Sequence, residues 1–427
     1  PPAQTHQRAR PTAVSRLKDG RPTSVKNPSP AALTALLAVL GLLNSFASDM
    51  VIPALPSLRD ELRVSDWQAQ QVVSVFFAAC AFMSLWYGAL ADAWGRRAVT
   101  LGALAVVAVA AIGCLVARQI EQIWLLRACQ GLASGAGLVI SRTVVRDLHI
   151  GRTAQKLLSR IMMVQTLALV AMPVIGGVLA QAFGWRAVFA ALAGFMLLLL
   201  AACWRWLPET LPVADRRPLR PAALWPAYRD VFRSGGFLRL SAAHVANWVA
   251  MAMYAFSAPA IVIHHFGRTA SDAWLVFAPI TVGLVAGFVA FPRVARARTG
   301  AAVLGLAYRF LGAAVALNLA VCALLPSGPL QLAPLLLFSV GMALALPILI
   351  DRALAAVPTA LGGVAASCQT FLQFAVMAAG AGLLAPLLWH SLFALALGTG
   401  LMTAVGGACL WHESRRRAGT ACPAPGS

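Results

Sequence analysis

The sequence predicts an all-α membrane protein with twelve transmembrane helices in two six-helix halves. The first observation is composition: 60% of the 427 residues are hydrophobic, 11% are charged, and the mean hydropathy is +0.78. Water-soluble domains carry about 25% charged residues because their surfaces face water, so this composition excludes a soluble globular protein. The second observation is a series of apolar runs of about 20 residues, the length that a helix needs to cross a bilayer.

The apolar runs give the expected helices in order. The first run, near residues 33–55, is too long for the apolar core of a signal peptide, so we expect it to remain as helix 1. Short polar segments separate the later runs. These runs lie at residues 68–88, 98–117, 122–141, 161–182, 187–206, 238–263, 272–291, 301–325, 329–350, 361–386 and 390–411.

The distribution of basic residues predicts the orientation. With a cytoplasmic N-terminus, 27 of the 34 Lys and Arg residues lie in cytoplasmic segments, five lie in outside loops, and Arg127 and Arg309 fall inside spans. Cytoplasmic loops carry an excess of Lys and Arg, so we expect both termini in the cytoplasm. The bias toward Arg and Ala is typical of a GC-rich bacterial genome, and the expected location is the bacterial cytoplasmic (inner) membrane.

Polar segments divide the chain. Residues 1–30 are rich in Pro, Arg, Ser and Thr and are expected to form a disordered cytoplasmic arm. Residues 208–236 contain five arginines, five prolines and two adjacent glycines, which indicates a cytoplasmic linker. The linker separates an N-terminal half, 31–207, from a C-terminal half, 237–411, and residues 412–427 form a cytoplasmic tail. Two similar halves predict a substrate cavity between them near the bilayer midplane.

Several function classes are excluded. The net charge of +20 comes from basic residues scattered between apolar runs, without the single basic patch of a nucleic-acid-binding protein. The eight cysteines form no CxxC pair and no zinc-ligand spacing, so neither a metal nor another cofactor is expected. The sequence has no Walker motif for an ATP-driven pump, no clustered catalytic residues for an enzyme, and no filter loop for a channel. These absences disfavour an ATP-driven pump, a membrane-embedded enzyme and a channel.

The most specific motif lies between helices 2 and 3, from Gly88 to Arg97. Asp92 at the end of helix 2 can accept hydrogen bonds from a helix N-terminus or an arginine. Gly88 and Gly95 permit close helix approach and a tight turn. With Arg96 and Arg97, these residues predict a breakable conformational latch. The alternative is a loop whose two arginines only set the orientation.

This stretch resembles motif A of the major facilitator superfamily, and further segments resemble its Bcr/CflA-type drug:proton antiporters. Those segments are Asp49–Pro56 at the end of helix 1, Arg127, Gln130, Gly131 and Gly135 as motif B in helix 4, Arg142–Leu148 after it, Gly184–Phe189 and Leu207–Leu211 around helix 6, and Gly363–Phe374 in helix 11. The resemblance covers residues 31–411. It implies the superfamily fold and the export of drug-like or natural-product molecules in exchange for protons.

Two departures from the family pattern affect what we expect. The helix 5 antiporter motif has Met172 where the family has glycine, but Pro173, Gly176 and Gly177 are kept, so a kink and close packing are expected. The position of a second motif A, residues 292–298, lacks the acid. The two halves should therefore have unequal latches.

Asp49 and Arg127 are the candidates for proton coupling. Asp49 is the only acid well inside an apolar span, where a charge is costly. At the helical rise, Asp49 lies roughly 10 Å below the outer end of helix 1 and Arg127 about 7 Å below that of helix 4. The resemblance places these helices side by side, so protonation of Asp49 should change its charge balance with Arg127. Alternatively, Asp49 only caps helix 1 and Arg127 only braces helix 4.

A substrate cavity is predicted from polar and aromatic residues in the apolar helices. Such a lining suits neutral or cationic amphipathic molecules and loose specificity. Each residue taken singly is more typical of a helix–helix hydrogen bond or an interfacial anchor. The candidates are Asn44, Phe46, Gln165, Asn247, Trp248, Tyr254, Gln369 and Gln373.

The leading hypothesis is a monomeric, proton-coupled exporter of drug-like or natural-product molecules, with small-molecule substrates, protons and membrane lipids as its partners and no nucleic acid. The alternative is a transporter of the same fold with one narrow metabolite substrate, such as an amino acid, a nucleoside or a siderophore, working as an exporter or a uniporter.

Overall fold

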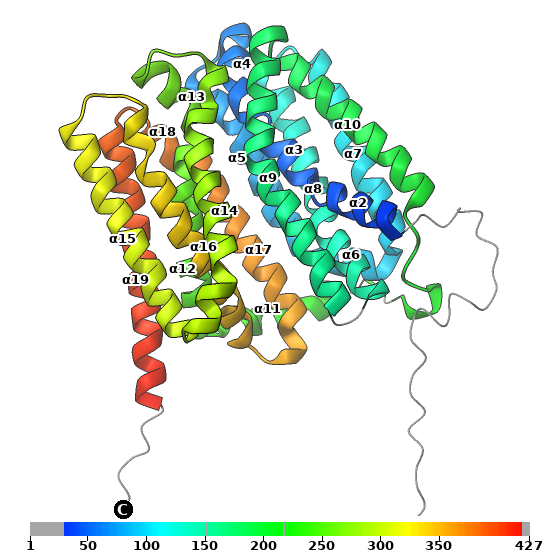
Figure 1. The fold of residues 1–427 in the computed structure, drawn as a ribbon. Coiled ribbons are helices and arrows are strands. Elements are labelled where there is room, and N and C mark those ends of the chain that lie inside the picture. Colours follow the sequence, from blue (N-terminus) through cyan, green and yellow to red (C-terminus); the bar gives the residue numbers. More distant parts are fainter. Residues whose placement is uncertain (1–29, 150–151, 217, 220, 421–427) are drawn as a thin grey trace, which may run out of the picture.

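The computed structural model describes residues 30–149, 152–216, 218–219 and 221–420, and every regular element in these ranges is helical (Figure 1). This confirms the all-α prediction. The helices run side by side between two ends of the molecule. We name these the α4 end, which also holds α13 and α18, and the α11 end, which also holds α6 (Figure 1). Most of the predicted arm, residues 1–29, lies outside the described residues.

The first half comprises α2 (Pro30–Leu40), α3 (Leu43–Ser48), η1 (Ile52–Ala54), α4 (Leu55–Leu62), α5 (Asp66–Ser84), α6 (Tyr87–Trp94), α7 (Arg96–Val116), α8 (Ile120–Leu148), α9 (Arg152–Phe183) and α10 (Trp185–Trp206). The connecting segment holds η2 (Val213–Asp215) and α11 (Pro221–Arg233). The second half comprises α12 (Gly235–Phe256), α13 (Ala258–Ala260), η3 (Ile261–His265), η4 (Ala270–Ala273), α14 (Trp274–Ala297), α15 (Gly300–Leu324), η5 (Pro329–Leu332), α16 (Pro334–Ala355), η6 (Thr359–Leu361), α17 (Gly362–Ala379), η7 (Gly380–Leu384), α18 (Ala385–Leu388) and α19 (Leu392–Thr420).

These elements account for the twelve predicted spans. Within the described residues, eight helical segments are long and apolar enough to cross a membrane as single spans. Three more spans are bent pairs, with angles of 41° between α2 and the α3–α4 segment, 56° between α5 and α6, and 43° between α12 and the α13–η3 segment. The 32-residue helix α9 lies at the remaining predicted span, residues 161–182.

The bends have local causes. The break between α2 and α3 falls at Gly41, whose carbonyl oxygen accepts a hydrogen bond from the Gln165 side chain of α9 at 3.0 Å. A side chain that bonds to the helix backbone is a common cause of a kink. The bend after α12 precedes Pro259, which has no N–H group for the helical hydrogen-bond ladder.

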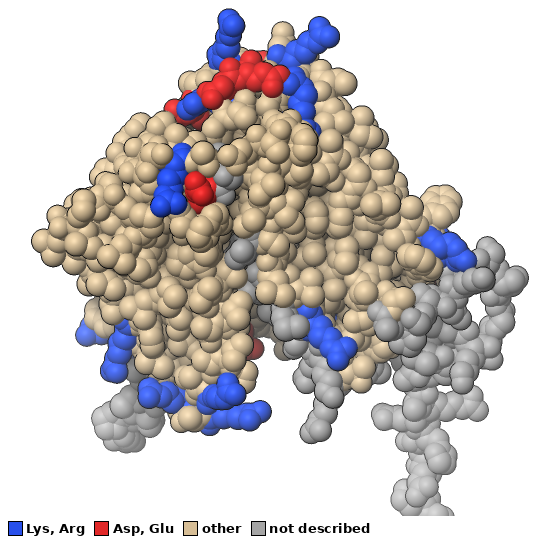
Figure 2. Space-filling view, turned by 45° about the horizontal axis from the view of Figure 1, so that its top comes forward, with Lys and Arg blue, Asp and Glu red and all other residues tan. Residues whose placement is uncertain are grey.

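The surface agrees with a membrane environment. Charged side chains gather at the two ends of the molecule, and a broad uncharged band separates them on the face drawn in Figure 2. Many large apolar side chains are exposed on the long helices, including Val109 on α7, Leu198 on α10 and Val289 on α14. In water this exposure would be unfavourable, whereas in lipid it costs nothing. The chain is a multi-pass membrane protein.

The two halves meet mainly along α5, which contacts α17 and η7. Ser74 Oγ donates a hydrogen bond to the carbonyl oxygen of Ala378 at 2.8 Å, and Gln71 Nε2 donates to that of Gly382 at 3.1 Å. Next to them, the Phe77 ring stacks on Phe374. A second contact joins α9 to α14 and η4. The halves are therefore tied together toward the α4 end. The domain boundaries drawn from the sequence stay a prediction.

Candidate functional site

The predicted latch lies where α6 gives way to α7. Gly95 joins the two helices with a φ of +96°, which residues with a side chain rarely adopt. A Cβ atom at this position would also meet the carboxylate of Glu209, in the loop after α10. Glycine is therefore needed both for the turn and for the approach of an acidic side chain.

Arg96 is the centre of an ion-pair network. Its side chain is buried, with 7% exposure, and its guanidinium pairs with Asp92 at 2.8 Å and with Asp147 of α8 at 3.5 Å. Arg96 Nη1 also donates to the carbonyl oxygen of Ala91 at 2.6 Å. Thr210 Oγ1 donates to the Asp147 carboxylate at 2.7 Å. The latch predicted from Asp92 and Arg96 thus extends to α8 and to the loop after α10.

Glu209 caps the start of α7. Its carboxylate accepts hydrogen bonds from the backbone N–H groups of Arg96, at 3.0 Å, and Arg97, at 3.3 Å. These N–H groups have no partner within the helix, and the positive end of the helix dipole favours a carboxylate. Glu209 also accepts from the N–H of Leu211 at 3.0 Å, and the Arg216 guanidinium lies 3.7 Å away. One carboxylate therefore joins α7 to the linker.

Sequence reasoning missed Asp147 and Glu209 as partners of the latch. Glu209 is 113 residues from Arg96 along the chain, so no local spacing could pair them. The available signal was the acid inside the Leu207–Leu211 segment. Conversely, Gly88 makes no close helix approach here, because no atom lies within 4 Å of where its Cβ would be.

Arg127 is fully buried in α8. Its Nε donates to the carbonyl oxygen of Val72 at 3.1 Å, and its Nη1 donates to Gln130 Oε1 at 2.7 Å. Nη1 also donates to the carbonyl oxygen of Ala47, and the guanidinium lies 4.3 Å from the centre of the Phe76 ring. Nη2 has no partner among the described residues. The side chain thus joins α8 to α5 and to the end of α3.

Asp49 directly follows α3, two residues after Ala47. Its side chain is partly buried, and its carboxylate accepts a hydrogen bond from Ser48 Oγ at 2.6 Å. The same hydroxyl lies 2.9 Å from the carbonyl oxygen of Asn44. Within the described part of the chain, Asp49 forms no ion pair. The Arg127 side chain is therefore bonded to the backbone of helix 1 two residues before Asp49.

The helix 5 glycine motif packs against this same region. A Cβ atom at Gly176 of α9 would meet the backbone carbonyl oxygen of Met50, the residue after Asp49. Gly177 is also buried, and α9 continues through Pro173 as one helix. The glycine at 176 therefore sets how closely helix 5 approaches the acid-bearing segment of helix 1.

The motif B glycines perform the same role on α8. A Cβ atom at Gly131 would meet the carbonyl oxygen of Phe76 on α5, and one at Gly135 would approach the Tyr87 ring to 2.6 Å. Gln130, between Arg127 and these glycines, is buried, and its Nε2 has no partner among the described residues. Motif B thus combines close packing with a polar side chain that holds Arg127.

Most predicted substrate-cavity residues make contacts between or within helices. The hydrogen bonds run from Gln165 Nε2 to the Gly41 carbonyl (3.0 Å), from Cys80 Sγ to Asn44 Oδ1 (3.7 Å), from Asn247 Nδ2 to the Tyr308 hydroxyl (3.2 Å) and from Asn318 Nδ2 to the Tyr254 hydroxyl (2.6 Å). Phe46 stacks on Phe195 of α10, and Trp248 packs on the core of the second half. Gln369 is buried with its Nε2 unpartnered among the described residues, and Gln373 lies one turn further along α17.

A cavity of about 740 Å³ separates the two halves at the α11 end. Gly88 and Asp92 of α6 line one side, and Gly363 and Ser367 of α17 line the other. Tyr228 of α11 borders it as well, and its hydroxyl donates to the carbonyl oxygen of Leu85, between α5 and α6. The latch segment thus faces the second half across a space that is large enough for a drug-sized molecule.

The family model described as Major Facilitator Superfamily matches residues 37–381. The chain belongs to the major facilitator superfamily. Solved transporter structures share the fold: the chain aligns with the human organic anion transporter MFSD10 at a TM-score of 0.65 and 20% identity, over 91% of this chain and 99% of that one. The POT family transporter PepTSo aligns at a TM-score of 0.71 and 14% identity, with the same coverage.

Curated relatives are named for drug resistance. The chain is 32% identical over 184 residues to a bicyclomycin resistance protein homolog of Haemophilus influenzae, covering 43% of this chain and 46% of the relative. It is 30% identical over 212 residues to multidrug resistance protein D of Escherichia coli, covering 48% and 51%, and 28% identical over 261 residues to a chloramphenicol resistance protein of Pseudomonas aeruginosa, covering 60% of each. The chain spans about half the length of the curated relatives it matches. The resemblance to the major facilitator superfamily is thereby confirmed, and these relatives carry drug-resistance names.

Proposed function

We propose that this major facilitator superfamily transporter exports drug-like or natural-product small molecules across the bacterial cytoplasmic membrane in exchange for protons. The single observation that carries the proposal is Asp49, a carboxylate within helix 1 that has no cationic partner among the described residues and follows by two residues the Ala47 carbonyl to which the buried Arg127 donates. A carboxyl group in this setting can exist in either protonation state, as a coupling site requires. The drug-resistance names of the relatives support the substrate class.

Ser48 offers a local mechanism for the proton step. Its hydroxyl has a single proton and lies within hydrogen-bonding distance of both Asp49 and the Asn44 carbonyl. With Asp49 ionised, Ser48 donates to the carboxylate. With Asp49 protonated, the carboxyl group donates to Ser48 Oγ, and Ser48 donates to Asn44. Both protonation states are then hydrogen-bonded, so neither incurs the cost of an unpaired buried polar group.

Arg127 serves as the fixed positive charge of this cycle. Its guanidinium is held by backbone oxygens, by Gln130 and by the Phe76 ring, so it stays in place while Asp49 gains and loses its proton. Asp49 takes up a proton from the outside when helix 1 is exposed there, and it releases the proton to the cytoplasm in the state that accepts substrate.

The latch and the cavity suggest the direction of the cycle. We place the α11 end in the cytoplasm, together with both termini, because most basic residues belong to the segments at that end. The contacts toward the α4 end and the 740 Å³ cavity at the α11 end then correspond to a state open to the cytoplasm. Substrate enters the transporter at this end. The transporter works as a monomer and uses no cofactor. The Asp92–Arg96–Asp147 network reorganises when the latch segment meets α17.

Everted membrane vesicles test this proposal. An imposed pH gradient is followed while chloramphenicol or bicyclomycin is added, for the wild type, Asp49→Asn and Asp49→Glu. We expect substrate-dependent proton movement in the wild type, its loss in Asp49→Asn and partial recovery in Asp49→Glu. Asp230→Asn, which removes an exposed acid of α11, is the matched control and should behave as the wild type.

Two outcomes would contradict the proposal. Substrate transport without proton movement would favour the uniporter alternative. Proton-coupled transport by Asp49→Asn at the wild-type rate would place coupling at another group.

A further inference from the structure

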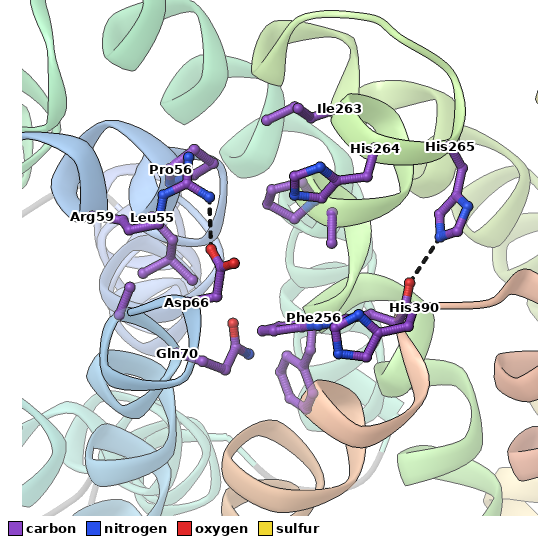
Figure 3. Close-up of a pocket in the computed structure, with 14 residues that line it drawn as sticks. Leu55, Pro56, Arg59, Asp66, Gln70, Phe256, Ile263, His264, His265 and His390 are labelled. Carbon is purple, nitrogen blue, oxygen red and sulfur yellow. Dashed lines mark hydrogen bonds and ion pairs between the residues drawn. The ribbon is translucent and has the colours of Figure 1, made fainter. Parts of the chain in front are cut away.

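A second cavity, of about 370 Å³, lies between the halves at the α4 end (Figure 3). Arg59 of α4 and Asp66 and Gln70 of α5 form its first wall. The second wall combines imidazole rings with large apolar side chains from α12, η3 and the segment after α18. These second-wall residues are Phe256, Ile263, His264, His265, Trp389 and His390. The volume falls within the range of small-molecule sites, about 300–1,000 Å³.

Gln70 is a buried polar side chain in the lining of this cavity. Its side chain is only 2% exposed, and its Nε2 has no hydrogen-bond partner among the described residues. Figure 3 shows its amide pointing from α5 into the space between the two walls. A buried N–H donor without an acceptor is unfavourable and rare, so Gln70 Nε2 is available to donate to an oxygen acceptor in the cavity.

Both segments that frame the second wall are irregular in the same way. Ile261–His265 and Gly380–Leu384 are π-helical, and the second leads directly into α18. π-Helical turns are rare and occur frequently at functional sites. Here the two π-helical segments change the direction of the helix ends, and His264 and Trp389 border the same cavity.

The charges on the walls indicate an uncharged ligand. Arg59 pairs with both Asp60 and Asp66, each at 2.7 Å, so two carboxylates neutralise the one arginine in the lining of this cavity. His265 is already bonded to the carbonyl oxygen of Trp389 at 2.8 Å. The remaining lining consists of the imidazoles of His264 and His390, of Gln70, and of apolar and aromatic side chains such as Phe256.

We propose that this cavity is a second ligand site, which takes an uncharged aromatic molecule with an oxygen acceptor for Gln70 Nε2. Because the site takes one wall from each half, a bound molecule holds the halves together at the α4 end. Binding there does not require proton coupling at Asp49. A ligand that arrives from the α4 end therefore slows transport by holding the halves together where they would have to separate.

The test uses two fluorescent probes on the purified full-length protein. Dansylamide is aromatic and carries sulfonyl oxygens, whereas N-phenyl-1-naphthylamine is aromatic and has no oxygen acceptor. We expect Gln70→Leu to raise the Kd for dansylamide about tenfold, the effect of one lost hydrogen bond. The Kd for the naphthylamine should stay within about twofold of its wild-type value, because this probe makes no such bond. Ile263→Trp fills the cavity and should weaken the binding of both probes. Gln331→Leu changes a buried glutamine outside the cavity and should leave the binding of both probes unchanged.

Size-exclusion chromatography establishes that each variant is folded before titration. Wild-type dansylamide binding in folded Gln70→Leu and Ile263→Trp would overturn the proposal, as would an equal loss of both probes in Gln70→Leu. Since binding is measured without a gradient, failure of the antiport experiment leaves this result unaffected, and the reverse also holds.

Discussion

Glu209 is the residue on which the hydrogen bonds of the latch loop converge. Its carboxylate joins the first turn of α7 to its own loop and lies close to Arg216 of the linker. A glutamine at this position keeps the shape but loses the charge that the helix N-terminus and the arginine favour.

We expect Glu209→Gln to lower the stability of the protein by about 1 kcal/mol, the size of one charge–dipole interaction. The measurement is the melting temperature of the purified protein in detergent. Asp215→Asn removes an exposed acid from the same linker and serves as the control. An equal decrease in both variants would show that net charge, rather than the cap, is responsible.

The sequence was sufficient for the local part of this site and insufficient for its distant partners. Asp92 and Arg96 are four residues apart at a helix junction, and they form the predicted pair. Asp147 and Glu209 reach Arg96 only because α8 and the loop after α10 fold onto it. Asp49 and Arg127 were singled out by their burial among apolar residues, but no spacing could show that the arginine bonds to the backbone beside the acid.

At the scale of helices, glycine contacts set how closely the elements approach. Gly176 is in direct contact with the backbone of Met50, whereas Gly194 of α10 has no atom within 4 Å of its Cβ position. The two glycines therefore form a matched pair, one at a close contact and one facing open space.

We expect Gly176→Ala to destabilise the protein by about 1–3 kcal/mol through overpacking and to reduce transport, because helix 1 is displaced next to Asp49. Gly194→Ala should retain wild-type stability and transport. Thermal melting and vesicle transport measure the two effects. Full activity of a folded Gly176→Ala variant would contradict the positioning role assigned to this contact.

Helix breaks were harder to predict than helix number. Twelve apolar runs predicted twelve spans, because span length is set by bilayer thickness. The break at Gly41 depends on an amide from α9, 124 residues away, and so depends on the tertiary fold. The hydropathy pattern likewise does not predict the 56° bend between α5 and α6.

At the scale of the molecule, the halves are joined by α5 and α17, whose contacting residues are about 300 positions apart. Alternating access requires these contacts to open toward the α4 end. Ser74 and Gly382 lie opposite each other there: a Cβ atom on Gly382 would be 2.8 Å from that of Ser74. Disulfides need about 3.5–4.5 Å between Cβ atoms, so a small backbone adjustment admits one.

The double variant Ser74→Cys, Gly382→Cys, in a background without the native cysteines, should form a disulfide under oxidising conditions and lose transport at least about tenfold. This estimate assumes that opening is obligatory in each cycle. Dithiothreitol should restore transport, and each single variant is a control. Undiminished transport by the cross-linked protein would show that the halves do not separate at this end.

The turn between α14 and α15 differs from its counterpart in the first half. Arg293, Arg296 and Arg298 are exposed there, and none of them forms an ion pair with a described carboxylate. The first half neutralises its turn internally, through Asp92, Asp147 and Glu209. The arginines of the second half have no such partner among the described residues, and at a bilayer surface we expect lipid phosphate groups to supply their counterions. One turn thus carries its own counterions, whereas we expect the charge balance of the other to vary with the lipid headgroups around it.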